Sequence, residues 1–97
     1  MALKNPTTGE YLKITGIALS DESVTQINYK IYQSVEHRLA GDSEYLHALN
    51  SMVNSGLLAE AFNRQADGTD SIANNFKKAG YEAIKSDKFT FSTWEDA

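Results

Sequence analysis

The stretch QINYKIY, Gln26–Tyr32, alternates between polar and apolar side chains. Ile27, Tyr29 and Ile31 fall on one side of an extended chain, and the polar residues between them fall on the other. β-Branched and aromatic residues on the apolar side are typical of a strand with one buried face. The sequence therefore predicts a strand over residues 24–33 that packs its apolar face on a core.

The stretch upstream, Tyr11–Leu19, is the natural partner of this strand. Its apolar residues change face at Gly16, and a glycine inside a strand often marks a bulge that corrects such a shift. The residues between the two stretches, 20–23, are polar and few enough for a tight connection. We therefore predict an antiparallel hairpin over residues 11–33, with a bulge near Gly16.

Residues 43–85 are expected to be the helical part of the chain. Tyr45, Leu49 and Met52 are spaced as one helical stripe. The stretch Leu57–Ala66 is rich in helix formers, and its alternative is a short strand around residues 62–65. Ser71–Lys85 is predicted as the last helix, in which Gly80 either weakens the helix or permits close packing.

The two ends of the chain are expected to be extended. Residues 1–10 form a predicted flexible arm with turn chemistry at Asn5–Gly9, and this arm either frays or orders on a neighbouring molecule. Residues 88–94 form an extended C-terminal segment. The 97 residues thus predict a single α+β domain: an N-terminal antiparallel hairpin packed against two or three helices, possibly with a short C-terminal strand.

Composition and charge exclude several classes of protein. The net charge is −4 with a pI of about 5.0, which disfavours a general nucleic-acid binder. The chain has no cysteine, so neither a disulfide framework nor thiolate chemistry is expected. It has no apolar run of membrane-spanning length and no apolar core of a signal peptide, so we expect neither membrane insertion nor secretion through a signal peptide.

No motif for catalysis or cofactor binding stands out. Glu44 and His47 have the spacing of a helical metal-ligand pair, but two ligands are too few for a closed site. Nucleophile-elbow and glycine-rich phosphate-loop patterns do not occur in the sequence. We therefore expect a protein that is not an enzyme and that needs no metal or cofactor.

Aromatic residues supply the candidate interface. These are Tyr32, on the polar side of its strand, and three C-terminal residues, Phe89, Phe91 and Trp94. The C-terminal aromatics either close the core or line a subunit interface, where such residues are enriched. Stacking on single-stranded nucleic acid, helped by Lys85 and Lys88, is disfavoured by the negative net charge. A small domain benefits from a partner subunit, so a homo-oligomer is expected.

Three stretches resemble a loose group of small tailed-bacteriophage proteins whose genes lie among those for the tail and its tip. They are Met1–Lys4 leading into an early strand, Lys30–Gln33 running into Glu36–Gly41, and Tyr81–Lys85 followed by Phe89 and a closing Glu95-Asp96. They cover a minority of the chain and include no catalytic motif. The chain differs from the group at residues 42–53, where helical spacing replaces a proline-bearing loop and a strand.

The resemblance implies a non-enzymatic structural or assembly protein of the phage tail region. Such a protein acts through contacts with itself and with other virion proteins, in the virion or in the host cytoplasm. The alternative is a small phage-encoded inhibitor that binds a host defence or replication protein. The resemblance transfers no functional residues to this chain.

Overall fold

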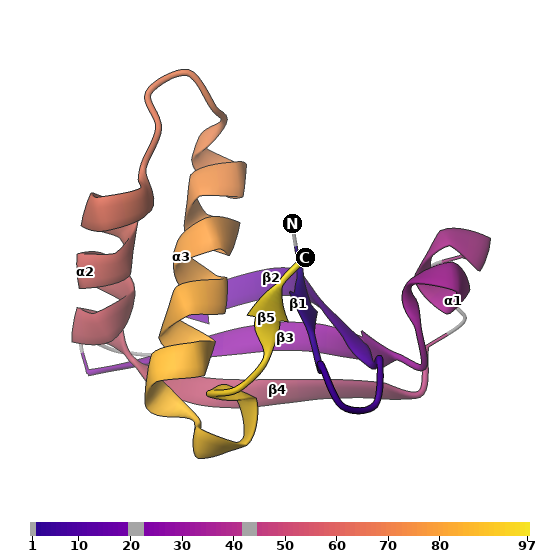
Figure 1. Ribbon diagram of the computed structural model, residues 1–97. Coiled ribbons are helices and arrows are strands. Elements are labelled where there is room, and N and C mark those ends of the chain that lie inside the picture. Colours follow the sequence, from indigo (N-terminus) through magenta and orange to yellow (C-terminus); the bar gives the residue numbers. More distant parts are fainter. Residues whose placement is uncertain (1, 20–22, 42–44) are drawn as a thin grey trace.

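A computed structural model describes residues 2–19, 23–41 and 45–97 of the chain (Figure 1). The elements in chain order are β1 (Leu3–Lys4), β2 (Tyr11–Leu19), β3 (Val24–Tyr32), α1 (Val35–Ala40), β4 (His47–Asn54), α2 (Ser55–Gln65), α3 (Ile72–Asp87), the 3₁₀ turn η1 (Phe89–Phe91) and β5 (Glu95–Asp96).

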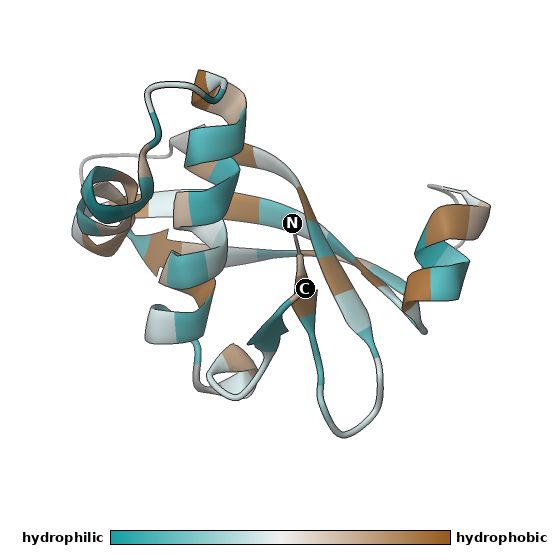
Figure 2. Cartoon of the chain, turned by 45° about the horizontal axis from the view of Figure 1, so that its top comes forward, coloured by the Kyte–Doolittle hydropathy of each residue, from teal (hydrophilic) through white to brown (hydrophobic). Residues whose placement is uncertain are grey.

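The strands form one antiparallel sheet in the order β4-β3-β2-β1-β5. Helices α2 and α3 pack together at one end of the sheet, and α1 lies at the other end (Figure 1). Figure 2 shows brown hydrophobic positions on α1, where Val35 and Leu39 are exposed. The predicted α+β class, N-terminal hairpin and short C-terminal strand are confirmed.

The β2–β3 hairpin carries the core. Ile27, Tyr29 and Ile31 are buried, as the alternating pattern predicts, and they face Ile17, Ile14 and Leu12 across the hairpin. The register shifts between Ile14 and Gly16, so the predicted bulge is present. The bulge lets apolar residues before and after it share one face, because one extra residue reverses the alternation of side chains.

The N-terminal segment is not a flexible arm. Leu3 pairs with Leu12 of β2 and with Asp96 of β5, and Ala2 and Leu3 are fully buried. The predicted turn chemistry is real: Gly9 has a φ of 80°, and the Asn5 side chain accepts a hydrogen bond from the Thr7 N–H. The turn returns the chain into the sheet, where burial of Leu3 and the ladders on both sides hold it.

The helix expected at residues 44–53 is wrong, because this stretch forms strand β4. The helical stripe of Tyr45, Leu49 and Met52 is largely exposed rather than buried. β4 pairs residue by residue with β3, from Val24 opposite Asn54 to Ile31 opposite His47. This long ladder outweighs the weak local preference for helix, which tertiary context commonly overrides.

Asn54 marks the change from strand to helix. Its side chain accepts hydrogen bonds from the N–H groups of Gly56 and Leu57, which caps the start of α2. The alternatives for Leu57–Ala66 are thereby settled in favour of helix, with Ala66 just past its end. Gly56 lies in the first helical turn.

Gly80 permits a close approach between α3 and the sheet. A Cβ atom at this position would lie 2.9 Å from Ile14 Cδ1 and 3.3 Å from Ile17 Cδ1. One residue later, the Tyr81 hydroxyl accepts a buried hydrogen bond of 2.9 Å from the Ile14 N–H. The Ile14 N–H lies beyond the ladder between β1 and β2, and the side chain of Tyr81 thus supplies its acceptor.

The C-terminal segment is compact rather than extended over residues 88–94. Its first residues form η1, and only Glu95–Asp96 form a strand. Phe91 lies edge-on to Tyr29 at 5.7 Å and to Trp94 at 5.1 Å between ring centroids. These edge-to-face contacts close the core beneath the sheet.

We expect Ile27→Asp to lower the free energy of unfolding by about 3–5 kcal/mol, because it buries an unpaired charge. Ile27 has no exposed surface. The control is Asn28→Asp on the opposite face, where the new carboxylate can still accept the hydrogen bond from Gln26 Nε2. Urea denaturation checks both variants, and equal midpoints would show that the two faces are assigned wrongly.

We expect Tyr81→Phe to cost roughly 1–3 kcal/mol at neutral pH, because the buried Ile14 N–H loses its acceptor. Burial raises the pKa of Tyr81 from 10.0 to about 12. The stabilisation from this hydroxyl is therefore complete below pH 10 and is lost as the pH rises toward 12.

Urea denaturation of both proteins at pH 7, 9 and 11 measures this effect. The difference between wild type and variant should be constant up to pH 9 and smaller at pH 11. A difference that stays the same at pH 11 would contradict the assignment of the high pKa to Tyr81.

Candidate functional site

The two edges of the sheet differ in length and charge. The β5 edge has two residues, and both are acidic. The β4 edge has eight residues, His47–Asn54, with neither proline nor a formally charged side chain at pH 7. Short strands, charges and prolines are the usual means of preventing an edge from pairing with another chain. β5 carries such protection, whereas β4 does not.

Apolar side chains accompany the open backbone of β4. The exposed fractions are 49% for Leu46, 48% for Leu49, 38% for Met52 and 40% for the neighbouring Tyr45. Leu49 pairs with Tyr29 and so lies on the face that carries the core, whereas Met52 pairs with Gln26 and lies on the other face. We call these four residues, with the outer backbone of His47–Asn54, the β4 edge surface.

The rest of β4 is firmly attached to the domain. Val53 is fully buried, and the Ser51 hydroxyl lies 2.9 Å from the Tyr29 hydroxyl. At the strand's end, the hydroxyls of Thr25 and Ser55 lie 2.8 Å apart. The edge is therefore held in an extended, preorganised form, which lowers the entropy cost of pairing with another strand.

The interface residues predicted from sequence do not lie on this surface. Tyr32, Phe91 and Trp94 are buried within the chain, and the side chain of Phe89 lies outside the part that the structure describes. Phe91 and Trp94 close the core, which was one of the two roles expected for them. Tyr32 lies edge-on to Tyr45 and beneath the Arg38 guanidinium of α1, so it is not an exposed contact residue.

The sequence pattern instead predicted that Tyr45, Leu49 and Met52 form the buried stripe of a helix. The absence of charge over His47–Asn54 was the signal that pointed to an unprotected strand edge. It could be interpreted only after the strand itself was known, because an uncharged helix face and an uncharged strand edge have similar compositions.

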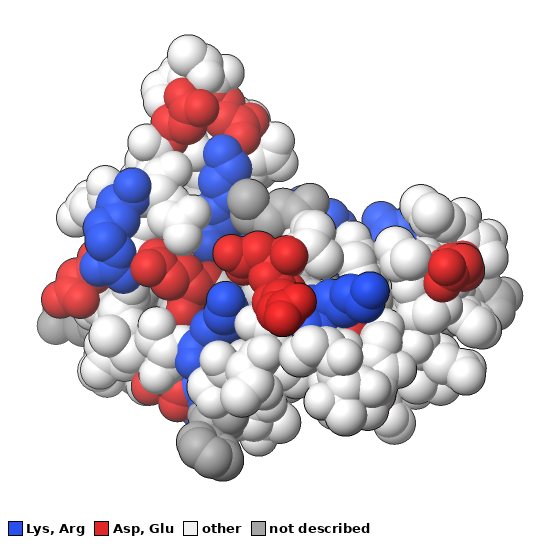
Figure 3. Space-filling model, in the orientation of Figure 1, with Lys and Arg blue, Asp and Glu red and all other residues white. Residues whose placement is uncertain are grey.

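Most of the lysines near the C-terminus lie close to acidic side chains. Lys78 lies 3.0 Å from Asp70, Lys85 lies 3.7 Å from Asp96, and Lys88 lies 3.5 Å from Asp87. Hydrogen bonds from Asn74, Lys78 and the Ser71 N–H lower the pKa of Asp70 to about 2. Figure 3 shows acidic and basic side chains side by side on this face. Such partly exposed pairs are typical of a protein surface.

Neither a metal-ligand cluster nor a membrane-spanning helix is found within the described residues. Within them, no group of three or more His, Cys, Asp or Glu side chains is placed to hold a metal ion. His47 lies in strand β4, and its expected partner Glu44 lies outside the described residues. Across the same ranges, no helix is long and apolar enough to cross a membrane. The β4 edge surface is the candidate functional site because its strand is long and uncharged and the apolar side chains beside it are exposed.

None of the family models, curated proteins or solved structures compared with this chain matches it.

Proposed function

We propose that this chain is a non-enzymatic structural or assembly protein of a tailed bacteriophage, acting in the tail region through protein–protein contacts. In this proposal the β4 edge surface joins the chain to a second copy of itself. The observation that carries it is the eight-residue, uncharged edge strand flanked by exposed Leu46, Leu49 and Met52. The phage assignment rests on the sequence resemblance alone.

An added strand is the partner that fits this edge. Every second residue of an edge strand turns its N–H and C=O groups outward, and a further strand can pair with all of them. The apolar side chains beside the ladder then add buried area on both faces of the joined sheet. Affinity in this mode comes from main-chain hydrogen bonds, and specificity comes from alternate side chains.

A second copy of β4 satisfies the same requirements. Two β4 strands related by a two-fold axis are antiparallel, which makes the contact isologous. Because His47–Asn54 carries no formally charged residue, self-pairing brings no like charges opposite each other. The two β4 strands would join two five-stranded sheets into one continuous sheet.

A contact of this kind is suited to an assembly in which the same contact is repeated many times. Each strand pairing is modest, but subunits in a symmetric particle hold one another at high effective concentration. An inhibitor that acts alone has no such help and must bind its single target tightly. The proposal therefore favours an assembly role over the inhibitor.

We expect the full chain to elute as a dimer or larger species whose size depends on concentration. Leu49→Lys should shift it toward monomer, because a charge at an edge opposes strand pairing. Ile72→Lys is the matched control: it also replaces an exposed aliphatic residue, 71% exposed, but at the start of α3. Size-exclusion chromatography with light scattering measures the mass.

Circular dichroism melts of the same samples show whether both variants stay folded. A wild-type chain that is monomeric at every concentration would overturn self-pairing through β4. Equal effects of the two substitutions would also count against it. A complex that depends on Leu49 but forms only when other virion proteins are added would support the β4 edge as the binding surface. It would replace the second copy of the chain with another virion protein as the partner.

Loss of the gene separates the assembly role from the inhibitor role. We expect particles made without this protein to be absent or incomplete by electron microscopy, because a structural contact is missing. The matched control is a phage that carries Ile72→Lys, which should make normal particles. Normal, infectious particles on a permissive host, with failure only on a host that carries a defence system, would replace the proposal with the inhibitor.

A further inference from the structure

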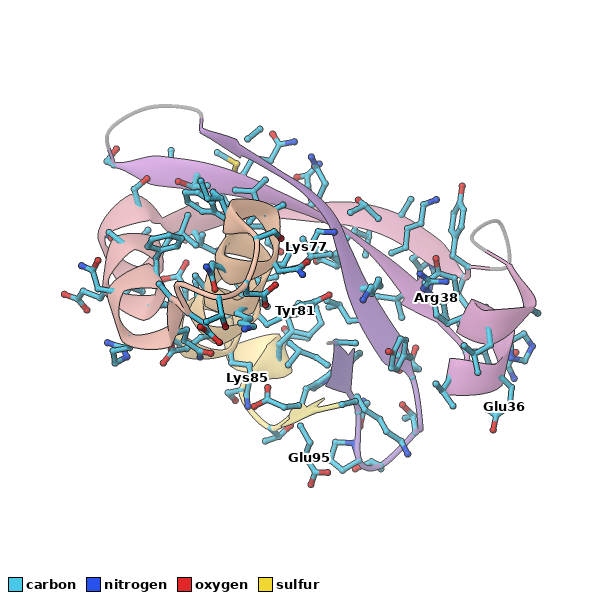
Figure 4. All side chains as sticks on the ribbon, turned by 90° about the horizontal axis from the view of Figure 1, so that it is seen from above. Glu36, Arg38, Lys77, Tyr81, Lys85 and Glu95 are labelled. Atoms are coloured by element: carbon cyan, nitrogen blue, oxygen red, sulfur yellow. The ribbon has the colours of Figure 1, made fainter. Side chains whose placement is uncertain are left out.

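Four basic side chains from four different elements line one groove of about 230 Å³. They are Lys13 of β2, Lys30 of β3, Arg38 of α1 and Lys77 of α3, and they are four of the nine basic residues in the chain. Figure 4 shows Lys77 and Arg38 on the two sides of β2. Residues far apart in the sequence thus bring positive charge to one place on an acidic protein.

The sheet places two of these charges opposite each other. Lys13 and Lys30 are directly paired in the β2–β3 register and share the face away from the core. Like charges opposite each other in a sheet are destabilising. Burial, followed by the nearby charges of Arg38 and Lys77, lowers the pKa of Lys13.

Aromatic rings hold two of the cations in place. The Lys30 Nζ lies 4.5 Å from the centre of the Tyr45 ring, and the Arg38 guanidinium carbon lies 5.7 Å from that of Tyr32. The two rings contact each other edge-on at 6.5 Å. Cation–π contacts of this kind restrict where the charges lie, so the groove is organised before any ligand arrives.

A backbone irregularity of β2 lies beside the groove. Thr15 occupies the bulge between Ile14 and Gly16, is exposed, and lines the same groove. Bulges re-aim side chains and are enriched beside binding sites. Thr15 adds a neutral polar residue to a lining that also includes Ile14 and Tyr32 beside the four cations.

We propose that this groove binds a small polyphosphate group, such as inorganic pyrophosphate or the diphosphate of a nucleotide. An Arg fork and several Lys point charges are the usual partners of phosphate oxygens. Several negative charges on one compact group match four cations around one groove better than a single carboxylate does. The proposal is independent of the assembly role.

The size of the groove separates this ligand from a polymer. Its volume of about 230 Å³ is below the roughly 300–1,000 Å³ of pockets that enclose drug-sized ligands. A nucleic-acid strand needs a basic track longer than one such groove, and the net charge of −4 opposes it. A short phosphate chain is the anion that fits both limits.

Isothermal titration of the full chain with inorganic pyrophosphate tests the proposal, with ADP and orthophosphate in parallel. We expect one site per chain, an affinity that falls as salt rises, and weaker binding of orthophosphate. Arg38→Gln should weaken pyrophosphate binding at least about tenfold, the usual scale for a lost charged contact. The matched control is Arg64→Gln, whose side chain instead lies 2.9 Å from Glu82.

Lys77→Gln is the second variant, because loss of the Arg38 contact with Tyr32 could also disturb α1. It should weaken binding without altering the melting temperature, since Lys77 is a half-buried residue on a helix surface. ADP that binds like pyrophosphate would identify a nucleotide diphosphate as the source, whereas weaker ADP binding would identify the free anion; both outcomes support the site.

Several results would overturn it. These are no saturable binding of either anion, equal losses in the Arg38 and Arg64 variants, or no loss in Lys77→Gln. Tighter binding of a poly-glutamate peptide or of a single-stranded oligonucleotide than of pyrophosphate would also overturn it, in favour of a macromolecular partner.

Discussion

Burial of Ile27, Tyr29 and Ile31 against the helices and η1 is the constraint on which the other elements depend. Because these residues alternate along β3, their burial fixes which face of the sheet points to the core. β2 can match that face only with its bulge, and α3 can approach it only because Gly80 leaves room for Ile14 and Ile17. The sheet order follows, since β3 is paired on both sides.

The same constraint determines which surfaces remain available. Core residues on one face require polar residues on the other, so Lys13 and Lys30 share the face away from the core. The two packed helices lie at one end of the sheet, which leaves Leu49 of β4 exposed although it points to the core side. The open face and the open edge are therefore consequences of a small core rather than separate additions.

The sequence predicts this fold best where local pattern and tertiary structure agree. The alternation at Gln26–Tyr32 and the phase change at Gly16 are local signals, and both are realised. β4 was not predicted, because Tyr45, Leu49 and Met52 have helical spacing, and only pairing with β3 makes the stretch extended. β1 was missed for a similar reason: two residues carry no periodicity, and their burial depends on β2 and β5.

Neither candidate site was predicted from the sequence, because each becomes recognisable only once the fold is known. The groove joins residues from positions 13 to 77, so only the fold places their charges together. Tyr32, Phe91 and Trp94 were predicted to be interface residues, but they are buried inside the chain. Their aromatic character predicted that they make contacts, but not whether those contacts are internal. Composition indicates that large apolar area must be buried somewhere, whereas topology decides which residues bury it.

Tyr45 links the two surfaces physically. Its ring lies beneath the Lys30 ammonium in the groove, and it is also an exposed member of the β4 edge surface. A strand added to β4 that changed the position of this ring would change where Lys30 lies, and an anion that fixed Lys30 would favour one position of the ring. Such an effect must be reciprocal, because a coupling free energy between two binding equilibria is the same from either side. If pairing through β4 changes the affinity for the anion by some factor, the anion must therefore change the strength of that pairing by the same factor.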